Sequence, residues 1–174
     1  IYVANSKSSS LTVIDSARME PAGKILLPAG PLWMTVPETA DVMYVLVNDS
    51  GNTLLTVDLE SGRAGGPMTV GRSSFGARER FVAVSPDNSL LFLQSGLTET
   101  AGRPRVALVN GRSLTEFRVN YHTDHPGPAT IDLQGARIYG GYFVYTLDML
   151  QKIGEMQCLF CAPHPTKNLL FGAK

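Results

Sequence analysis

The residues Phe81–Ser95, FVAVSPDNSLLFLQS, decide the fold of this 174-residue chain. Phe81–Ser85 alternates apolar and small residues, Pro86-Asp87-Asn88 has turn chemistry, and Leu90–Leu93 is a second apolar run. This pattern predicts two antiparallel β-strands joined by a tight turn. The same phrase recurs three more times, with a strand-like run, a turn-forming stretch and a strand ending near Tyr or Phe, in the ranges 33–46, 128–141 and 160–173.

Two further strand patterns follow each phrase and complete a unit of four strands. The first of them ends in Asp or Asn, whose side chain can accept a bond from a backbone amide two residues on, at Asp15, Asp58, Asn110 and Asp148. The second is the outermost strand, which we expect at Pro67–Val70 in the second unit. No long stretch has the 3.6-residue period of a helix, so the predicted fold class is all-β.

A four-stranded unit that repeats every ~40–50 residues predicts a β-propeller. One such sheet cannot bury both of its faces alone, and neighbouring sheets around a ring cover each other. The first strand of the phrase carries a small residue, as crowding near the axis requires, at Thr35, Ala83, Thr130 and Ala162. Trp33 and Phe81 share one position of the repeat and are expected in the core.

Blade boundaries are expected near residues 32, 80, 127 and 159, with three complete and two partial blades over residues 1–174. The two partial blades together hold one strand more than a blade needs. We therefore expect a segment of a larger propeller, with a compact sandwich of another kind as the alternative.

The composition excludes several classes of function. Lys+Arg and Asp+Glu both total 15, so no net charge attracts nucleic acid or an anionic membrane. Hydrophobic residues make up 44% and charged residues 17%, as in a globular domain, and no apolar run is long enough to span a membrane. Few Cys and Lys beside many Ser, Thr and Gly favour a periplasmic or extracellular β-protein.

Two stretches resemble the YVTN-type β-propeller repeat, which combines a YV-x-N strand, a V-I-D strand and an S-P-D-G turn: IYVANSKSSSLTVIDSARM (1–19) and FVAVSPDNSLLFL (81–93). Asn88 stands where that pattern has Gly, and the other units lack the S-P-D. The run RPRVALVNGRSLTEF (103–117) is similar to propeller subunits of quinoprotein amine dehydrogenases. That resemblance implies a seven-bladed periplasmic subunit without a cofactor of its own, packed against a small quinone-bearing subunit.

Polar residues concentrate in two loops that enter innermost strands. One loop contains YHTDH (121–125), and the equivalent loop one unit earlier contains Arg78-Glu79-Arg80. Such loops surround the mouth of a propeller channel, so the sequence predicts a binding site from Arg78, Arg80, His122, Asp124 and His125. The alternatives are solvated loops, or metal binding by the two His and the Asp.

Cys158 and Cys161 are the two cysteines, in the pattern C-x-x-C-x-x-H with His164. They could form a disulfide if Leu159-Phe160 makes a tight turn, and the alternatives are two packed thiols or a metal or redox site. Cys161 and His164 would point to opposite faces of one strand, which argues against a shared metal. Ala162 follows the motif, so covalent haem attachment through C-x-x-C-H is excluded.

No nucleophile elbow, phosphate loop or H-E-x-x-H motif is present. The first hypothesis is therefore a non-catalytic propeller scaffold that presents its loops to a protein partner or ligand, with no catalytic residue, metal or cofactor in this chain. The second is a subunit of a periplasmic amine-dehydrogenase-like oxidoreductase whose cofactor lies on a neighbouring chain. The third is a hydrolase with a metal in the channel, for which Asp132 and His164 are the inner-strand candidates.

Overall fold

A computed structural model of the chain describes residues 1–49, 53–70, 79–95, 104–110, 113–119, 129–132, 134, 136–140, 143–148, 151–156, 160–163 and 170–173. In these residues the regular structure is all strand apart from one 3₁₀-helix, η1 (Ser6–Ser8), which confirms the all-β prediction. No helix in the described ranges has the length and hydropathy needed to cross a membrane.

The described strands form five sheets that follow one another along the chain. The first contains β1 (Tyr2–Asn5), β2 (Ser10–Asp15) and β3 (Glu20–Leu26). The second contains β4 (Pro31–Thr35), β5 (Val42–Val47), β6 (Leu54–Asp58) and β7 (Arg63–Pro67). The third contains β9 (Glu79–Val84), β10 (Leu90–Ser95), β11 (Pro104–Asn110) and β12 (Ser113–Val119), with β8 (Thr69–Val70) at its edge. The fourth contains β13 (Ala129–Asp132), β14 (Arg137–Gly140), β15 (Phe143–Thr146) and β16 (Lys152–Glu155), and the fifth β17 (Phe160–Pro163) and β18 (Leu170–Ala173).

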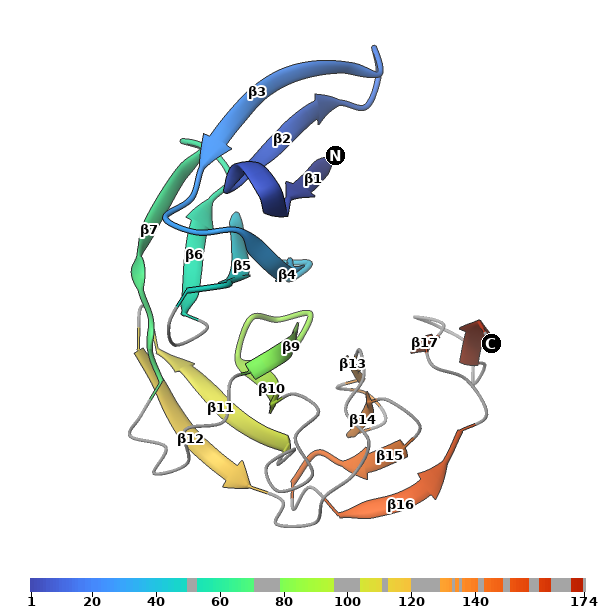
Figure 1. Cartoon of the computed structure of the whole chain (residues 1–174). Helices are drawn as coiled ribbons and strands as arrows, with labels where there is room; N and C mark the ends of the chain where they lie inside the picture. Colours follow the sequence, from blue (N-terminus) through green and yellow to red (C-terminus); the bar gives the residue numbers. More distant parts are fainter. Residues whose placement is uncertain are drawn as a thin grey trace.

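The sheets are arranged around an arc, as Figure 1 shows. The first strands of the phrase, β4, β9 and β13, lie on its concave side, and the outermost strands β7, β12 and β16 lie on its convex side. Thr35, Ala83 and Thr130 are on these concave strands, where small side chains were expected. The arrangement is propeller-like.

The edge of the third sheet corrects one expectation from the sequence. The pattern predicts the outermost strand of the second sheet at Pro67–Val70, but that strand is β7, Arg63–Pro67. Thr69–Val70 forms β8 instead, which pairs in parallel with β12 of the third sheet. The reason is the burial of Met68, whose side chain is only 5% exposed and packs between the second and third sheets, so the chain changes sheets at this residue.

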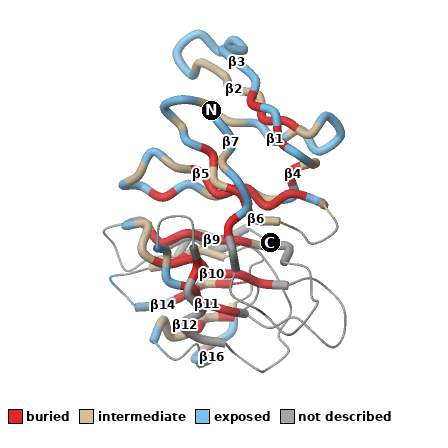
Figure 2. The backbone as a smooth tube through the Cα atoms, turned by 90° about the vertical axis from the view of Figure 1, so that its left-hand side faces the viewer, coloured by how far each residue is buried: buried red, intermediate tan, exposed pale blue. Residues whose placement is uncertain are grey.

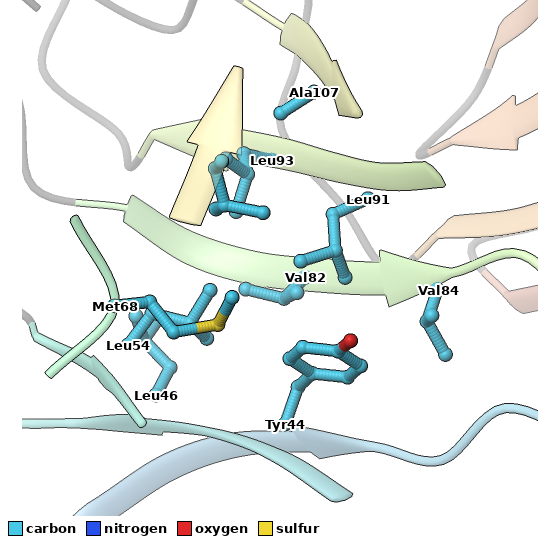
Figure 3. Close-up of a cluster of buried hydrophobic side chains, with 10 residues drawn as sticks. Tyr44, Leu46, Leu54, Met68, Val82, Val84, Leu91, Leu93 and Ala107 are labelled. Carbon is cyan, nitrogen blue, oxygen red and sulfur yellow. The ribbon is translucent and has the colours of Figure 1, made fainter. Parts of the chain in front are cut away.

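Each pair of neighbouring sheets from the first to the fourth encloses its own apolar cluster. The clusters follow from the two-residue period of strands: Met43 and Val45 face the first sheet, while Tyr44 and Leu46 on the same strand face the third. Figure 3 shows Tyr44 and Leu46 pointing toward the strands of the third sheet, and in Figure 2 buried residues run through the middle strands. The core is thus divided among sheet interfaces rather than concentrated in one centre.

β2 and β3 of the first sheet are joined in the same way as the third and fourth strands, β6–β7, β11–β12 and β15–β16, of the next three sheets. A register shift interrupts their pairing beside Val13, Thr56, Val106 and Val144, the residues whose positions in the repeat correspond. In three of these sheets a glycine lies against that residue, at Gly23, Gly65 and Gly154. Bulges twist an exposed edge strand and hinder pairing with another molecule.

Two of the predicted aspartates close the hairpins into outer strands, Asp15 with the amide two residues on and Asp58 with the amide three residues on. The Asp15 Oδ1 atom accepts a bond of 2.8 Å from the Ala17 amide, and Asp58 Oδ1 accepts one of 2.7 Å from the Ser61 amide.

Candidate binding face at the start of the inner strands

The ends of the sheets at which β4, β9 and β13 begin are called here the loop face. β9 lies against both β4 and β13. The first residues of these three strands therefore lie on the same side of the arc. The connection between β1 and β2, which contains η1, reaches it too, because the Leu27 amide donates a 2.9 Å bond to the Ser9 carbonyl.

Four of the five residues predicted to bind lie outside the described ranges: Arg78, His122, Asp124 and His125. Cys158 of the predicted disulfide and His164 of the metal alternative also lie outside them. Arg80 and Cys161 lie on β9 and β17, but their side chains are outside the description as well. The predicted binding site and the predicted disulfide remain predictions. What the structure adds is the position of Arg80 on the backbone.

Arg80 is the extra residue of a β-bulge at the loop face. Glu79 pairs with Ser95 and Phe81 with Gln94, so Arg80 has no opposite residue on β10. The second sheet repeats this irregularity at the same position, since Pro31 pairs with Val47 and Trp33 with Leu46. A bulge changes the direction of a side chain, and bulges are common beside functional sites.

An aromatic pair lies directly after these bulges. The rings of Trp33 on β4 and Phe81 on β9 meet edge to face, with centroids 5.2 Å apart and planes at 79°. Trp33 packs against the cluster between the second and third sheets. Both side chains are only partly buried, so the pair joins the core to the surface of the loop face.

Two buried polar side chains at this end of the third sheet were not singled out from the sequence. Gln94 is 0% exposed and Arg105 is 7% exposed. Gln94 pairs with Phe81 and Arg105 with Leu93, so the two side chains lie on opposite faces of the sheet. The sequence does contain a sign of both residues, because each is a polar residue within an otherwise apolar strand pattern, LLFLQ for Gln94 and RVALV for Arg105.

A close backbone approach fixes the first sheet to the second at the loop face. A Cβ atom on Gly30 would collide with the carbonyl oxygen of Ser6 in η1. The Gly30 carbonyl accepts a 2.7 Å bond from the Asn48 amide. Only glycine can bring the chain this close, so the position requires it.

The opposite end of the sheets carries an interlocking turn, Ser85–Ser89. The Asp87 Oδ1 atom accepts bonds from the Ser85 hydroxyl at 2.6 Å, the Ser89 hydroxyl at 2.7 Å and the Ser89 amide at 3.0 Å. These bonds, led by the one from Ser85, lower the pKa of Asp87. The Pro86 carbonyl accepts bonds from the amides of Glu38 and Thr39 in the second sheet's turn. This end is held together internally, so we assign it a structural role.

The Tyr44 hydroxyl adds a further link by donating a 2.7 Å bond to Asn88 Oδ1. Burial raises the pKa of Tyr44, with the Asn88 bond opposing the shift. Asn88 has a φ of 61°, in the left-handed region that glycine favours. This explains why the repeat pattern has Gly at this position and why Asn, which tolerates that region, replaces it.

The described residues contain no group of three or more His, Cys, Asp or Glu able to hold a metal ion. Asp132, one inner-strand candidate for such chemistry, ends β13 at the side opposite the loop face and pairs with Arg137 in the ladder.

No family model matches the chain, and no curated protein matches it. Solved structures do resemble it. Hydrazine synthase from Kuenenia stuttgartiensis has a TM-score of 0.65 at 16% identity, over 87% of this chain and 40% of that chain. A candidate 6-phosphogluconolactonase from Bacteroides uniformis has a TM-score of 0.68 at 16% identity, over 87% of this chain and 49% of that one. At this identity the likeness shows the fold alone, a propeller-like all-β architecture, and the chain spans less than half of each structure.

Proposed function

We propose that this chain is a segment of a larger β-propeller of the YVTN-repeat type, acting as a non-catalytic scaffold. Its loop face binds a protein partner or ligand in the periplasm or outside the cell. The observation that carries the proposal is the repeated bulge before Trp33 and Phe81, which stands at the start of two neighbouring inner strands. The ladder is interrupted at Leu32 and at Arg80, and bulges of this kind are over-represented next to functional sites.

The loop face also offers the chemistry that protein interfaces use. It combines a partly buried aromatic pair, Trp33 and Phe81, with an arginine at the bulge. Aromatic residues and Arg are enriched at the centres of interfaces. The predicted residues Arg78, His122, Asp124 and His125 precede β9 and β13, which lie next to each other, and would extend this surface.

The test is affinity capture with the immobilised chain from a periplasmic or secreted extract of the organism that makes it. We expect a retained protein or ligand that is lost with Arg80→Glu and with the double variant His122→Ala/His125→Ala. The matched control is Arg137→Glu, an exposed arginine at the opposite end of the fourth sheet. If the wild-type chain and all variants retain the same set, the loop face is not the binding surface.

The same capture separates the oxidoreductase alternative. A partner with the visible absorption of a quinone or haem would favour a redox subunit whose cofactor lies on a neighbouring chain. A partner without such a chromophore favours the scaffold.

A further inference from the structure

The second and third sheets present the same two-residue feature side by side at the loop face. In each sheet the residue at the bulge is followed directly by an aromatic residue, Leu32–Trp33 on β4 and Arg80–Phe81 on β9. The two rings meet with their centroids 5.2 Å apart. The bulge residues therefore flank one aromatic pair, Leu32 on the side of the second sheet and Arg80 on the side of the third. Figure 1 shows β4 and β9 next to each other on the concave side of the arc.

This combination is confined to the interface between these two sheets. The inner strands align on the residue that pairs with the repeated aromatic of the second strand, which is Thr35, Ala83 or Thr130. On that alignment the fourth unit has Gly127 in place of the bulge residue and Pro128 in place of the aromatic one. In the sequence, therefore, neither neighbour of the fourth unit finds an aromatic partner at this position.

The two bulge residues differ in chemistry, which gives the site an apolar half and a cationic half. Leu32 is 41% exposed and directly precedes the partly buried Trp33, so the two residues offer apolar surface. Arg80 brings a guanidinium group, which stays protonated in proteins. Glu79 supplies the opposite charge one residue earlier on β9, where the strand is paired with Ser95.

A second arginine lies one step deeper than the cationic half. Arg105 is 7% exposed and pairs with Leu93 on β10. Leu93 belongs to the cluster between the second and third sheets, so strand alternation places Arg105 on the face of the third sheet against which Trp33 packs. It is the one charged side chain among the buried residues that the structure describes. A charge in low-dielectric surroundings acts over a longer range than one in water, which favours an anion at this end of the interface.

We propose that Leu32, Trp33, Arg80 and Phe81 form a recognition site for an acidic segment of the partner protein. An apolar residue of the segment lies against Leu32 and Trp33, and a carboxylate of the segment binds at Arg80. Charge complementarity selects the acidic partner. Aromatic residues and arginine dominate the binding energy of many interfaces, and an arginine–carboxylate bond is charge-assisted. The inference rests on the proposed function and gives its binding surface a specific chemistry.

Trp33 is the only tryptophan of the chain, so tryptophan fluorescence reports on this site. The first probes are iodide and caesium, an anion and a cation that quench accessible tryptophan. Relative to N-acetyltryptophanamide, we expect iodide to be favoured over caesium about twofold, because the local potential is positive. Arg80→Gln should remove most of this preference, whereas Arg137→Gln, at the opposite end of the fourth sheet, should keep it. Absence of an iodide preference in the wild type would overturn the cationic half.

The second probe is the peptide acetyl-Leu-Asp-Asp-amide, titrated to millimolar concentration while the fluorescence of Trp33 is followed. We expect a saturable change, and binding about tenfold weaker for acetyl-Leu-Lys-Lys-amide and for acetyl-Ala-Asp-Asp-amide. Arg80→Glu should exchange the charge preference and bind the lysine peptide more tightly than the aspartate peptide. Leu32→Ser should bind the leucine and alanine peptides equally, because it lacks the apolar half. Such exchanges of preference are specific to direct contact, since a purely structural residue would weaken all peptides alike.

Circular dichroism checks that each variant folds, and Arg80→Gln and Leu32→Ser decide the matter if Arg80→Glu does not. Absence of binding at millimolar peptide, or weaker binding of every peptide without an exchange of preference, would overturn the proposal. Tighter binding of an oligothymidylate than of the acidic peptide would also overturn it, because bases stacked on the rings and phosphates at the arginine indicate single-stranded nucleic acid.

The proposed function fails in a different way. Capture that requires Arg80 but shows no acidic preference would contradict only the acidic-segment site and would leave the loop face as a binding surface. Equal capture by the wild type and all variants would contradict the loop face itself.

Discussion

The Tyr44–Asn88 bond provides a quantitative test of how neighbouring sheets are joined. The Tyr44 side chain is 2% exposed and its hydroxyl donates to Asn88 Oδ1 at 2.7 Å. A neutral hydrogen bond of this kind contributes about 1 kcal/mol to the free energy of unfolding, so Tyr44→Phe should lose about that amount. Asn88→Ala loses the bond and also places alanine, which tolerates a positive φ less well than asparagine, in the left-handed region. Together these two effects should lower the free energy of unfolding by about 2 kcal/mol.

Asn88→Gly separates the two contributions. Glycine avoids the left-handed strain of about 1–2 kcal/mol that alanine would carry at this position, so Asn88→Gly should lose little more than the hydrogen bond. The assay is urea unfolding of the single variants and of Tyr44→Phe/Asn88→Ala. The double variant should cost about 1 kcal/mol less than the sum of the single ones, because both remove the same bond. Additivity within about 0.3 kcal/mol would refute the bond as a link between sheets.

The same residue predicts a dependence on alkaline pH. Because burial raises the pKa of Tyr44 above its ordinary value, the folded state holds this proton more tightly than the unfolded state. Its contribution to stability is complete below the ordinary pKa of about 10 and is lost above it. Above pH 10 the free energy of unfolding should fall more steeply for the wild type than for Tyr44→Phe. Parallel curves would contradict the assignment.

Three further predictions follow from the interfaces. Phe92→Ala removes a ring that is 0% exposed between the third and fourth sheets and should cost about 3–5 kcal/mol in urea unfolding. Gly30→Ala should lower the free energy of unfolding by about 1–3 kcal/mol because its Cβ atom would collide with η1. The control is Gly66→Ala, whose added Cβ has nothing within 4 Å and which should unfold near the wild-type urea midpoint. Equal effects of the two substitutions would contradict the close approach at Gly30. Asp87→Asn should lose less thermal stability than the wild type on acidification below pH 4. Because the pKa of Asp87 is lowered in the folded state, its carboxylate stabilises the fold at pH values above the ordinary carboxyl pKa, and this contribution is lost as the pH falls through the folded-state pKa. An unchanged acid profile would show that the Ser85–Ser89 bonds do not depend on that charge.

The fold class and the order of strands were predictable because both depend on local chemistry. Alternation in FVAVS and the turn residues Pro86-Asp87-Asn88 indicate a hairpin whatever surrounds them. The side chains of Asp15 and Asp58 close hairpins with neighbours two or three residues away. Signals of this range are readable from the sequence alone.

The crossing at Met68 could not be predicted in the same way. Pro67–Val70 has strand character, but which sheet it joins depends on the apolar cluster around Met68, whose members, such as Tyr44 and Leu114, are distant from it in sequence. The same holds for Gln94 and Arg105, whose burial at the loop face results from the packing of several sheets. The candidate site was predicted from loop composition, and the structure contributed the bulge at Arg80 and the aromatic pair beside it.

By itself, then, the sequence determined that the chain is a repeat of short antiparallel strands, because periodicity and turn chemistry act over a few residues. The tertiary structure alone decided which faces and edges remain available. Val36 and Val84 hold the same place in the repeat, yet one is 45% and the other 8% exposed. Exposure depends on whether another strand covers a position, and that is a property of the assembled sheets rather than of any local stretch.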